Sequence, residues 1–181
     1  MPDDSVDAWE VLLYYIFTKS LPEERMHSTM VEDKGVSQLA LIRCWALGDK
    51  YEVKAFQDLV MIELLDLSSE VFITLEAAQE AFENTCEGSP IQTLVSRLIV
   101  ASVYLKRNHQ LWEFEELEDV PGYSAEITET LHEMHVQNWV PIKKLQNLQE
   151  EWDEGGLCEY LVGDGPEQHW LDKGEGKERL P

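Results

Sequence analysis

Apolar residues recur at helical spacing through most of the first 105 residues, and this periodicity is the feature that most restricts the fold. Five segments carry it, covering residues 6–17, 37–51, 53–67, 71–84 and 89–105. Within the third segment, Phe56, Val60 and Leu64 lie four residues apart and therefore share one helix face. No segment alternates apolar and polar residues as a half-buried strand does. We therefore predict a mainly α protein, a helical bundle with little or no sheet.

The clearest start of a helix is the tetrapeptide Ser89-Pro90-Ile91-Gln92. It places a hydroxyl at the N-cap, proline at the first helical position and glutamine at the third, which is a capping box. Upstream, Pro22 and the polar segment 23–35 predict a loop. Downstream, residues 124–134 and 141–152 each predict a further helix.

The first segment, from Val6 to Phe17, is apolar on all sides. A helix of this kind is either buried in the core or covered by a partner. Its aromatic side chains are more than a helix of about three turns can bury against one neighbour. Because aromatic residues are preferred interface anchors, we select Trp9, Tyr15 and Phe17 as candidate protein-contact residues.

The negative charge is distributed unevenly along the chain. Residues 1–109 contain 18 acidic and 9 basic side chains, whereas residues 110–181 contain 18 acidic and 5 basic ones. Long apolar segments lie in the first part, and acidic clusters fill the second. We therefore expect a packed helical domain over residues 1–109, an acidic helical extension over 110–155 and a disordered tail over 156–181.

The net charge of −22 excludes several kinds of partner. Phosphate backbones and anionic membranes repel such a chain, so we expect neither nucleic acid nor membrane as a partner. No apolar stretch of membrane-spanning length and no basic N-terminal region is present, which favours an intracellular protein, cytoplasmic or nuclear. The three cysteines, Cys44, Cys86 and Cys158, are odd in number and widely spaced, so we expect reduced thiols with Cys44 in the core.

The sequence contains no recognisable catalytic motif. His132 and His135 could share a helix face, and Cys158 or His169 could complete a zinc site. The zinc-protease motif, however, requires two histidines four residues apart, so we interpret this pair as surface histidines. Paired carboxylates occur throughout and single out no acid–base pair. We predict no catalytic, cofactor-binding or metal-binding residues, no small-molecule substrate and no enzymatic activity.

Several short motifs occur in a specific order. Trp9-Glu10, Leu12-Leu13 and Phe17-Thr18-Lys19 are followed by Gly48-Asp49-Lys50-Tyr51, and an apolar helix begins after residues 84–90. The segment from Trp9 to Lys19 resembles the mid-domain helix of BTB/POZ domains, and the segment that ends in Gly48-Asp49-Lys50-Tyr51 resembles the next helix. Residues 56–67 resemble the helix that closes that domain. The helix after residue 90 is similar to the extension of filamentous-fungal members.

The resemblance covers residues 6–107 and begins at Ser5, so it implies a partial domain that lacks the N-terminal strand–helix segment and the usual dimer face. It implies a protein–protein interaction module, an adaptor or scaffold linked to ubiquitin-ligase assembly, with cullin-3 or self-association as the contact and no cofactor. Lys19 stands where the family often has glycine, so we expect Lys19 to avoid positive φ. The alternative is an acidic helical regulator that binds a basic protein through its C-terminal region.

Overall fold

The computed structural model describes residues 5–22, 31–70, 72–104, 111–137 and 160–162. This part of the chain contains six α-helices, one 3₁₀ helix and no strand, which confirms the mainly α prediction for it. The helices are α1 (Val6–Thr18), α3 (Val31–Lys50), α4 (Lys54–Glu70), α5 (Leu75–Asn84), α6 (Pro90–Tyr104), the 3₁₀ helix η1 (Leu111–Leu117) and α7 (Tyr123–Gln137). The helix predicted for residues 141–152 lies outside the described residues.

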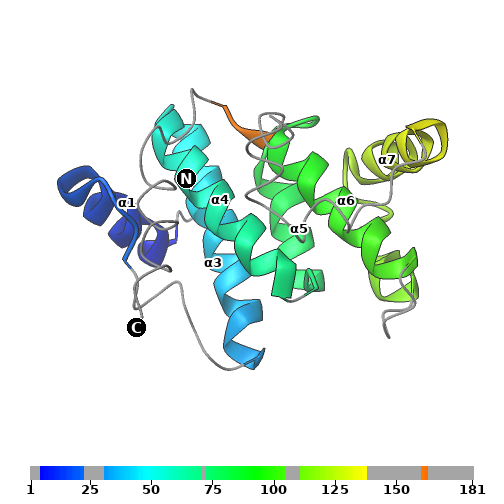
Figure 1. Ribbon diagram of the computed structural model, residues 1–181, viewed down its shortest axis with the longest axis horizontal. Coiled ribbons are helices and arrows are strands. Elements are labelled where there is room, and N and C mark those ends of the chain that lie inside the picture. The colour runs from blue at the N-terminus through cyan, green and yellow to red at the C-terminus, as the bar shows by residue number, and fades with distance from the viewer. Residues whose placement is uncertain (1–4, 23–30, 71, 105–110, 138–159, 163–181) are drawn as a thin grey trace, which may run out of the picture.

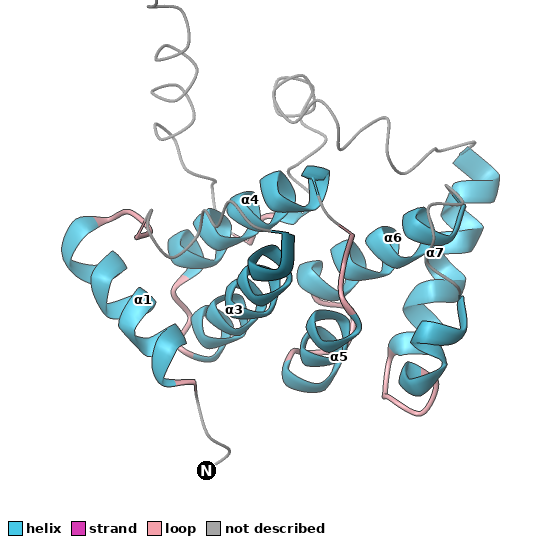
Figure 2. Cartoon of the chain, turned by 90° about the horizontal axis from the view of Figure 1, so that it is seen from below, coloured by secondary structure: helices cyan, strands magenta, loops and turns pink. Residues whose placement is uncertain are grey.

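The helices form a row that has α1 at one end and α7 at the other (Figures 1 and 2). In the middle of the row, α3 packs against α1, α4 and α5. Helix α6 then packs against α5 on one side and α7 on the other. Within the described part, other helices therefore cover α1 and α7 on one side each. The opposite, outer faces of these two helices are left without a covering helix of this part.

Helix α3 begins at Val31, six residues before the predicted start. The loop prediction over residues 23–35 is therefore wrong for residues 31–35, while residues 23–30 lie outside the described part. Gly35 favoured a loop because glycine costs about 1 kcal/mol in a helix interior. The rest of α3 packs on three other helices, and packing of this kind routinely overrides so small a propensity.

The turn between α3 and α4 depends on a close contact at Gly48. A Cβ atom at this position would lie 2.7 Å from Cγ of Gln57 and 3.1 Å from Cδ1 of Phe56, so any other residue here would require these two side chains to shift. The Gln57 side-chain amide donates to Oδ1 of Asp49 at 3.3 Å, and the Val53 N–H donates to the Gly48 carbonyl at 2.9 Å. Gly48 and Asp49 thus hold the start of α4 against the end of α3.

Helix α1 ends at Lys19, whose backbone is left-handed, with φ 59° and ψ 22°. The expectation that Lys19 avoids positive φ is therefore wrong. A left-handed residue at a helix C-terminus lets its N–H reach back to the last turn, and here the Lys19 N–H donates to the Tyr15 carbonyl at 2.7 Å. This bond offsets a conformational cost of about 1 kcal/mol for a residue other than glycine.

Side-chain caps fix the starts of α5 and α6. Helix α5 begins at Leu75, later than predicted, because the Thr74 hydroxyl caps it by accepting from the Ala77 N–H at 3.2 Å. Helix α6 begins at Pro90, as predicted. The side chain of Gln92 reaches back as in a capping box, but it accepts at 3.2 Å from the N–H of Gly88, one residue before the expected N-cap. Gly88 has φ +71°, which glycine adopts without strain.

A single apolar cluster runs through the row of helices. Its largest fully buried side chains are Trp45 and Phe56, and Phe82 of α5 continues it toward α7. The same cluster includes Phe114 of η1 and Tyr123 of α7, so the described part of the acidic segment 110–155 is packed onto the preceding helices. The change in charge at residue 109 is therefore not accompanied by a break in the core.

Residues 160–162 form a short strap that contacts α4 and α6 (orange in Figure 1). The guanidinium of Arg97 donates to the hydroxyl of buried Tyr160 and lies 5.3 Å from the centre of its ring. The N–H of Val162 donates to Oδ1 of buried Asp58 at 2.8 Å. These three residues of the segment predicted to be disordered, 156–181, thus contact the folded body, and the remainder of that segment lies outside the described residues.

Candidate functional site

The inner face of α1 attaches this helix to the rest of the molecule. Its buried residues are Val11, Leu12, Tyr15 and the small Ala8, which permits close packing on α3. The ring of Tyr15 lies 5.2 Å from that of Phe56 in α4, tilted by 42°. Burial raises the pKa of the Tyr15 phenol, and the nearby carboxylate of Asp58 raises it further, so the hydroxyl stays protonated.

The outer face of α1 is exposed and mostly apolar, and the exposed carboxylate of Glu10 lies among its side chains. Phe17 is 85% exposed and Val6 73%, while three further side chains are between 44% and 48% exposed. Val6, Leu13 and Phe17 are seven and four residues apart, a spacing that places them on one helix face. We call the five exposed apolar residues the outer stripe; they are Val6, Leu13, Tyr14, Ile16 and Phe17.

One edge of the outer stripe is extended by an aromatic pair. The ring of half-buried Trp9 lies 4.9 Å from that of Tyr51, which follows α3 and is 45% exposed. The ammonium group of Lys50 lies 5.7 Å from the centre of the Tyr51 ring. Apolar surface therefore continues from α1 onto the end of α3, with a cation at its border.

The C-terminal end of the outer stripe is held in place by local contacts. The Thr18 hydroxyl donates to the Tyr14 carbonyl at 2.8 Å, and the ammonium group of Lys19 lies 5.3 Å from the centre of the Tyr15 ring. Together with the left-handed cap at Lys19, these contacts order the last turn of α1. Phe17 is therefore presented to solvent from a structured helix end.

The three residues predicted to contact a protein partner occupy different environments. Phe17 belongs to the outer stripe, Trp9 lies at its edge, and Tyr15 is buried against Phe56 and cannot reach a partner at that surface. Four residues of the outer stripe, among them Leu13 and Val6, were not predicted from the sequence. The spacing of Leu13 and Val6 from Phe17 would have identified these two once one face of the helix was known to be the inner one.

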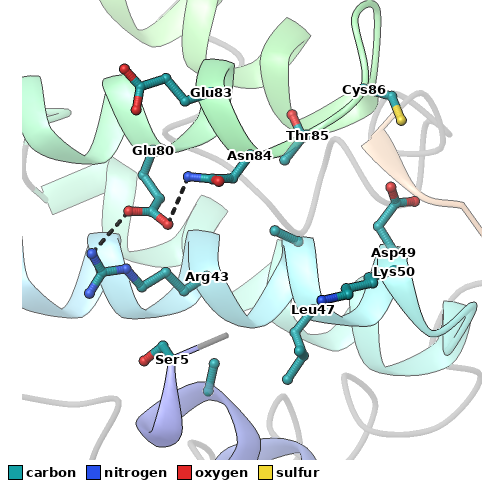
Figure 3. A pocket seen from close by; sticks show the side chains of 12 residues that line it. Ser5, Arg43, Leu47, Asp49, Lys50, Glu80, Glu83, Asn84, Thr85 and Cys86 are labelled. Carbon is teal, nitrogen blue, oxygen red and sulfur yellow. Dashed lines mark hydrogen bonds and ion pairs between the residues drawn. The ribbon is translucent and has the colours of Figure 1, made fainter. Parts of the chain in front are cut away.

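A cleft of about 850 Å³ lies between the start of α1, the second half of α3 and the end of α5 (Figure 3). Arg43 crosses it toward α5, where its guanidinium pairs with the Glu80 carboxylate at 3.0 Å. The Asn84 amide donates to the other Glu80 oxygen at 3.1 Å. The apolar part of its lining comes from Ala8, Ala46 and Leu47. Its lining carries two cations, Arg43 and Lys50, and three carboxylates, Asp49, Glu80 and Glu83.

The thiols and histidines do not form a reactive site in the described part of the chain. Cys44 is buried as predicted, and burial raises the pKa of its thiol to about 12, with Asp7 contributing, so it is neutral at physiological pH. Cys86 is exposed at the rim of the cleft. His132 and His135 are exposed on α7, and no cluster among the described residues could hold a metal ion. Cys158 and His169 lie outside the described residues.

None of the helices that the structure describes combines the length and apolarity needed to cross a membrane. Comparison with protein-family models, with curated proteins and with solved structures found no match for this chain. The candidate functional site is therefore defined by its own geometry, and the outer stripe of α1 is the surface that differs most from an ordinary solvated one.

Proposed function

We propose that this chain is a protein–protein interaction module that binds a partner through the outer stripe of α1. The observation that carries the proposal is the exposure of Phe17 and Val6 on an ordered helix, beside Leu13 on the same face. Large exposed apolar patches are uncommon on soluble monomers, and where they occur they commonly mark contact sites. Aromatic side chains in such patches supply much of the binding energy of an interface.

The order of motifs that resembles BTB/POZ domains supports a more specific form of the proposal. In that form the chain is an adaptor or scaffold of BTB/POZ type, present here as a partial domain. It contacts cullin-3 or a second copy of itself through α1. The close helix contact at Gly48 provides a physical reason for the Gly-Asp-Lys-Tyr motif on which the resemblance partly rests.

Binding measurements with purified components test this proposal. The full chain is titrated into purified cullin-3 by calorimetry, and its self-association is followed by sedimentation velocity. Phe17→Asp places a charge in the contact, so we expect binding or self-association to weaken by at least about 30-fold. Val136→Asp, on α7, is the matched control because Val136 is 63% exposed, and we expect it to change nothing.

Two results would contradict the proposal. Absence of both cullin-3 binding and self-association would remove the BTB/POZ-type function. Binding that is equally strong in Phe17→Asp and in the unsubstituted chain would remove the outer stripe as the contact. Circular dichroism of each variant shows whether the helices remain formed.

A second candidate function, an acidic regulator of a basic protein, is favoured by carboxylates that crowd at the start of α7. Burial raises the pKa of Glu126, and the neighbouring carboxylates of Glu129 and Glu133 raise it further, whereas Thr93 and Arg97 lower it. The exposed acidic side chains of the adjacent segment are Glu115, Glu116, Glu118 and Asp119. Binding to this region would weaken strongly between low and physiological salt and would be unaffected by Phe17→Asp, which distinguishes it from the apolar contact.

A further inference from the structure

We infer that the chain contains a binding site for a short tyrosine-containing peptide segment, and that its own strap, residues 160–162, occupies this site as an internal ligand. We call the two residues that hold the strap, Asp58 of α4 and Arg97 of α6, the strap seat. The strap seat is separate from the outer stripe and does not depend on the proposed function. The contacts of the strap indicate which chemistry the seat accepts.

The strap seat connects two helices whose main packing partners are other helices. Helix α4 packs on α3, whereas α6 packs on α5 and α7. The strap contacts both α4 and α6 (orange in Figure 1). It is therefore held at two points by side chains of separate elements, as a bound peptide is.

Both residues of the strap seat are charged and almost fully buried. Asp58 is 1% exposed and Arg97 is 7% exposed. Burial of a charge is costly, and apolar side chains of similar size often stabilise a buried contact equally well. The two charged groups therefore contribute more to selectivity for the bound segment than to stability.

The Arg97 end of the strap seat selects tyrosine. Its guanidinium donates to the Tyr160 hydroxyl and lies 5.3 Å from the centre of the Tyr160 ring. The same guanidinium pairs with the carboxylate of Glu133 in α7 at 3.0 Å, which holds it in place. Phenylalanine would fill the same space but would offer no acceptor to the guanidinium, and a site built around a hydroxyl rejects the analogue that lacks it.

The Asp58 end of the strap seat selects a backbone N–H two residues after the tyrosine. Its Oδ1 accepts from the Val162 N–H at 2.8 Å. Proline has no N–H and is therefore excluded from this position. The side chains of Leu161 and Val162 are half-buried against the apolar cluster. The preferred ligand is thus a tyrosine followed by two apolar residues, of which the second is not proline.

Attachment to the chain gives the strap an advantage over a free ligand. A tethered ligand has a high effective concentration at its own site, so a free peptide with the same contacts is excluded while the strap is bound. Removal of the Tyr160 hydroxyl or of the Val162 N–H weakens the internal ligand and leaves Asp58 and Arg97 unchanged. The strap seat should then accept the peptide from solution.

Fluorescence anisotropy of a labelled peptide tests the inference. The peptide has the sequence of residues 159–164, Glu-Tyr-Leu-Val-Gly-Asp, and is titrated with the full-length chain and with its variants Tyr160→Ser and Val162→Pro. We expect both variants to bind the peptide at least about tenfold more tightly than the unsubstituted chain does. Val136→Ser, at an exposed position on α7, is the control and should bind like the unsubstituted chain.

Two altered peptides test the chemistry of the strap seat. One carries Tyr160→Phe, and the other is methylated at the backbone nitrogen of Val162. Each lacks one group that the seat binds, so each should bind the two strap variants about tenfold more weakly than the original peptide does.

The other outcomes would overturn the inference. A peptide that binds neither strap variant would show that the seat recognises no segment from solution, and equal binding to all chains would place the peptide elsewhere. Equal binding of the three peptides would remove the hydroxyl and the N–H as determinants. Loss of the helices in both strap variants, measured by circular dichroism, would make the strap a part of the folded core. The outer stripe is tested separately by Phe17→Asp.

Discussion

The two ends of the row of helices differ in how they meet solvent. At one end, α1 is apolar on its inner and outer faces, with Leu12 buried and Phe17 exposed. At the other end, α7 presents mostly polar and charged side chains outward, including Glu129 and His132, with Leu131 and Val136 as the large apolar exceptions. In stacked helical proteins the terminal element needs a polar outer face for solubility. Helix α7 meets this requirement and α1 does not.

The attachment of the two end helices also differs, because α7 adds an ion pair to its apolar contacts. Helix α1 is held by apolar burial, through Leu12 and through Tyr15 against Phe56. Helix α7 is held by an edge-to-face contact of Tyr123 with Phe82 and by an ion pair between Arg97 and Glu133. The larger exposed apolar surface therefore lies on α1, as the proposed docking role of this helix requires.

The largest loss of stability is expected from shortening Leu12, which is buried on the inner face of α1. Leu12→Ala should reduce the free energy of unfolding by about 2–5 kcal/mol, because it leaves a cavity in the core. Thr130→Ala, at a buried position on the inner side of α7, should cost only about 1 kcal/mol. Urea unfolding followed by circular dichroism measures both. Equal losses would show that the two ends are anchored alike.

The next largest loss of stability is expected from breaking the ion pair between Arg97 and Glu133 of α7. Glu133→Ala removes the carboxylate that lies 3.0 Å from the nearly buried guanidinium of Arg97, and we expect a loss of about 1.5–3 kcal/mol. Glu80→Ala removes the partner of the more exposed Arg43 near α1 and should cost at most about 1 kcal/mol. A smaller loss from Glu133→Ala than from Glu80→Ala would contradict an electrostatic attachment specific to α7.

Substitution of the exposed apolar residues should alter surface properties and leave stability nearly unchanged. Leu13→Ser and Phe17→Ser should each change the free energy of unfolding by no more than about 0.5 kcal/mol, since neither side chain is buried. Binding of an apolar fluorescent dye to the native protein should nevertheless fall. Leu131→Ser and Val136→Ser on α7 provide the comparison. A marked destabilisation by Phe17→Ser would show that its ring is part of the fold.

The smallest effect concerns the pH dependence at the start of α7. The pKa of Glu126 is raised in the folded state, mainly by burial, so its ionised form reduces stability above that pKa. As the pH falls through the raised pKa, the native carboxyl takes up a proton and the penalty disappears. Glu126→Gln should therefore stabilise the protein at neutral pH, by less than about 0.5 kcal/mol, and not at acid pH.

Urea unfolding of the Glu126→Gln variant at neutral and at acid pH measures this dependence. The unsubstituted chain, measured over the same range of pH, is the control. A stabilisation by Glu126→Gln that persists at acid pH would mean that ionisation of Glu126 is not its cause.

Most helices could be predicted because their apolar residues repeat at a helical period. The predicted segment 53–67 corresponds to α4, which spans Lys54–Glu70, and the predicted Pro90 start of α6 is confirmed. The start of α3 could not be predicted, because residues 31–36 lack a regular apolar spacing and include Gly35. The left-handed backbone of Lys19 depends on a bond to the Tyr15 carbonyl, which composition does not reveal.

The candidate site could be predicted only in part. The sequence located the aromatic surplus in the correct helix, but a helix that is apolar on all sides does not reveal which face lies inward. That choice is made by α3 and α4, where Phe56 packs on Tyr15 and leaves Phe17 outside. The contacts of Tyr160 with Arg97 and of Val162 with Asp58 join distant parts of the chain and leave no local pattern.

The strap at residues 160–162 has a consequence for the order in which the protein is completed during synthesis. The hydrogen bond between Asp58 and Val162 joins residues that are 104 positions apart, and α4 and α6 leave the ribosome long before the strap does. The contacts of Arg97 and Asp58 with the strap can form only after residues 160–162 have been synthesised. Closure over so long a distance is slow compared with helix formation, so these contacts form after the helices that they join.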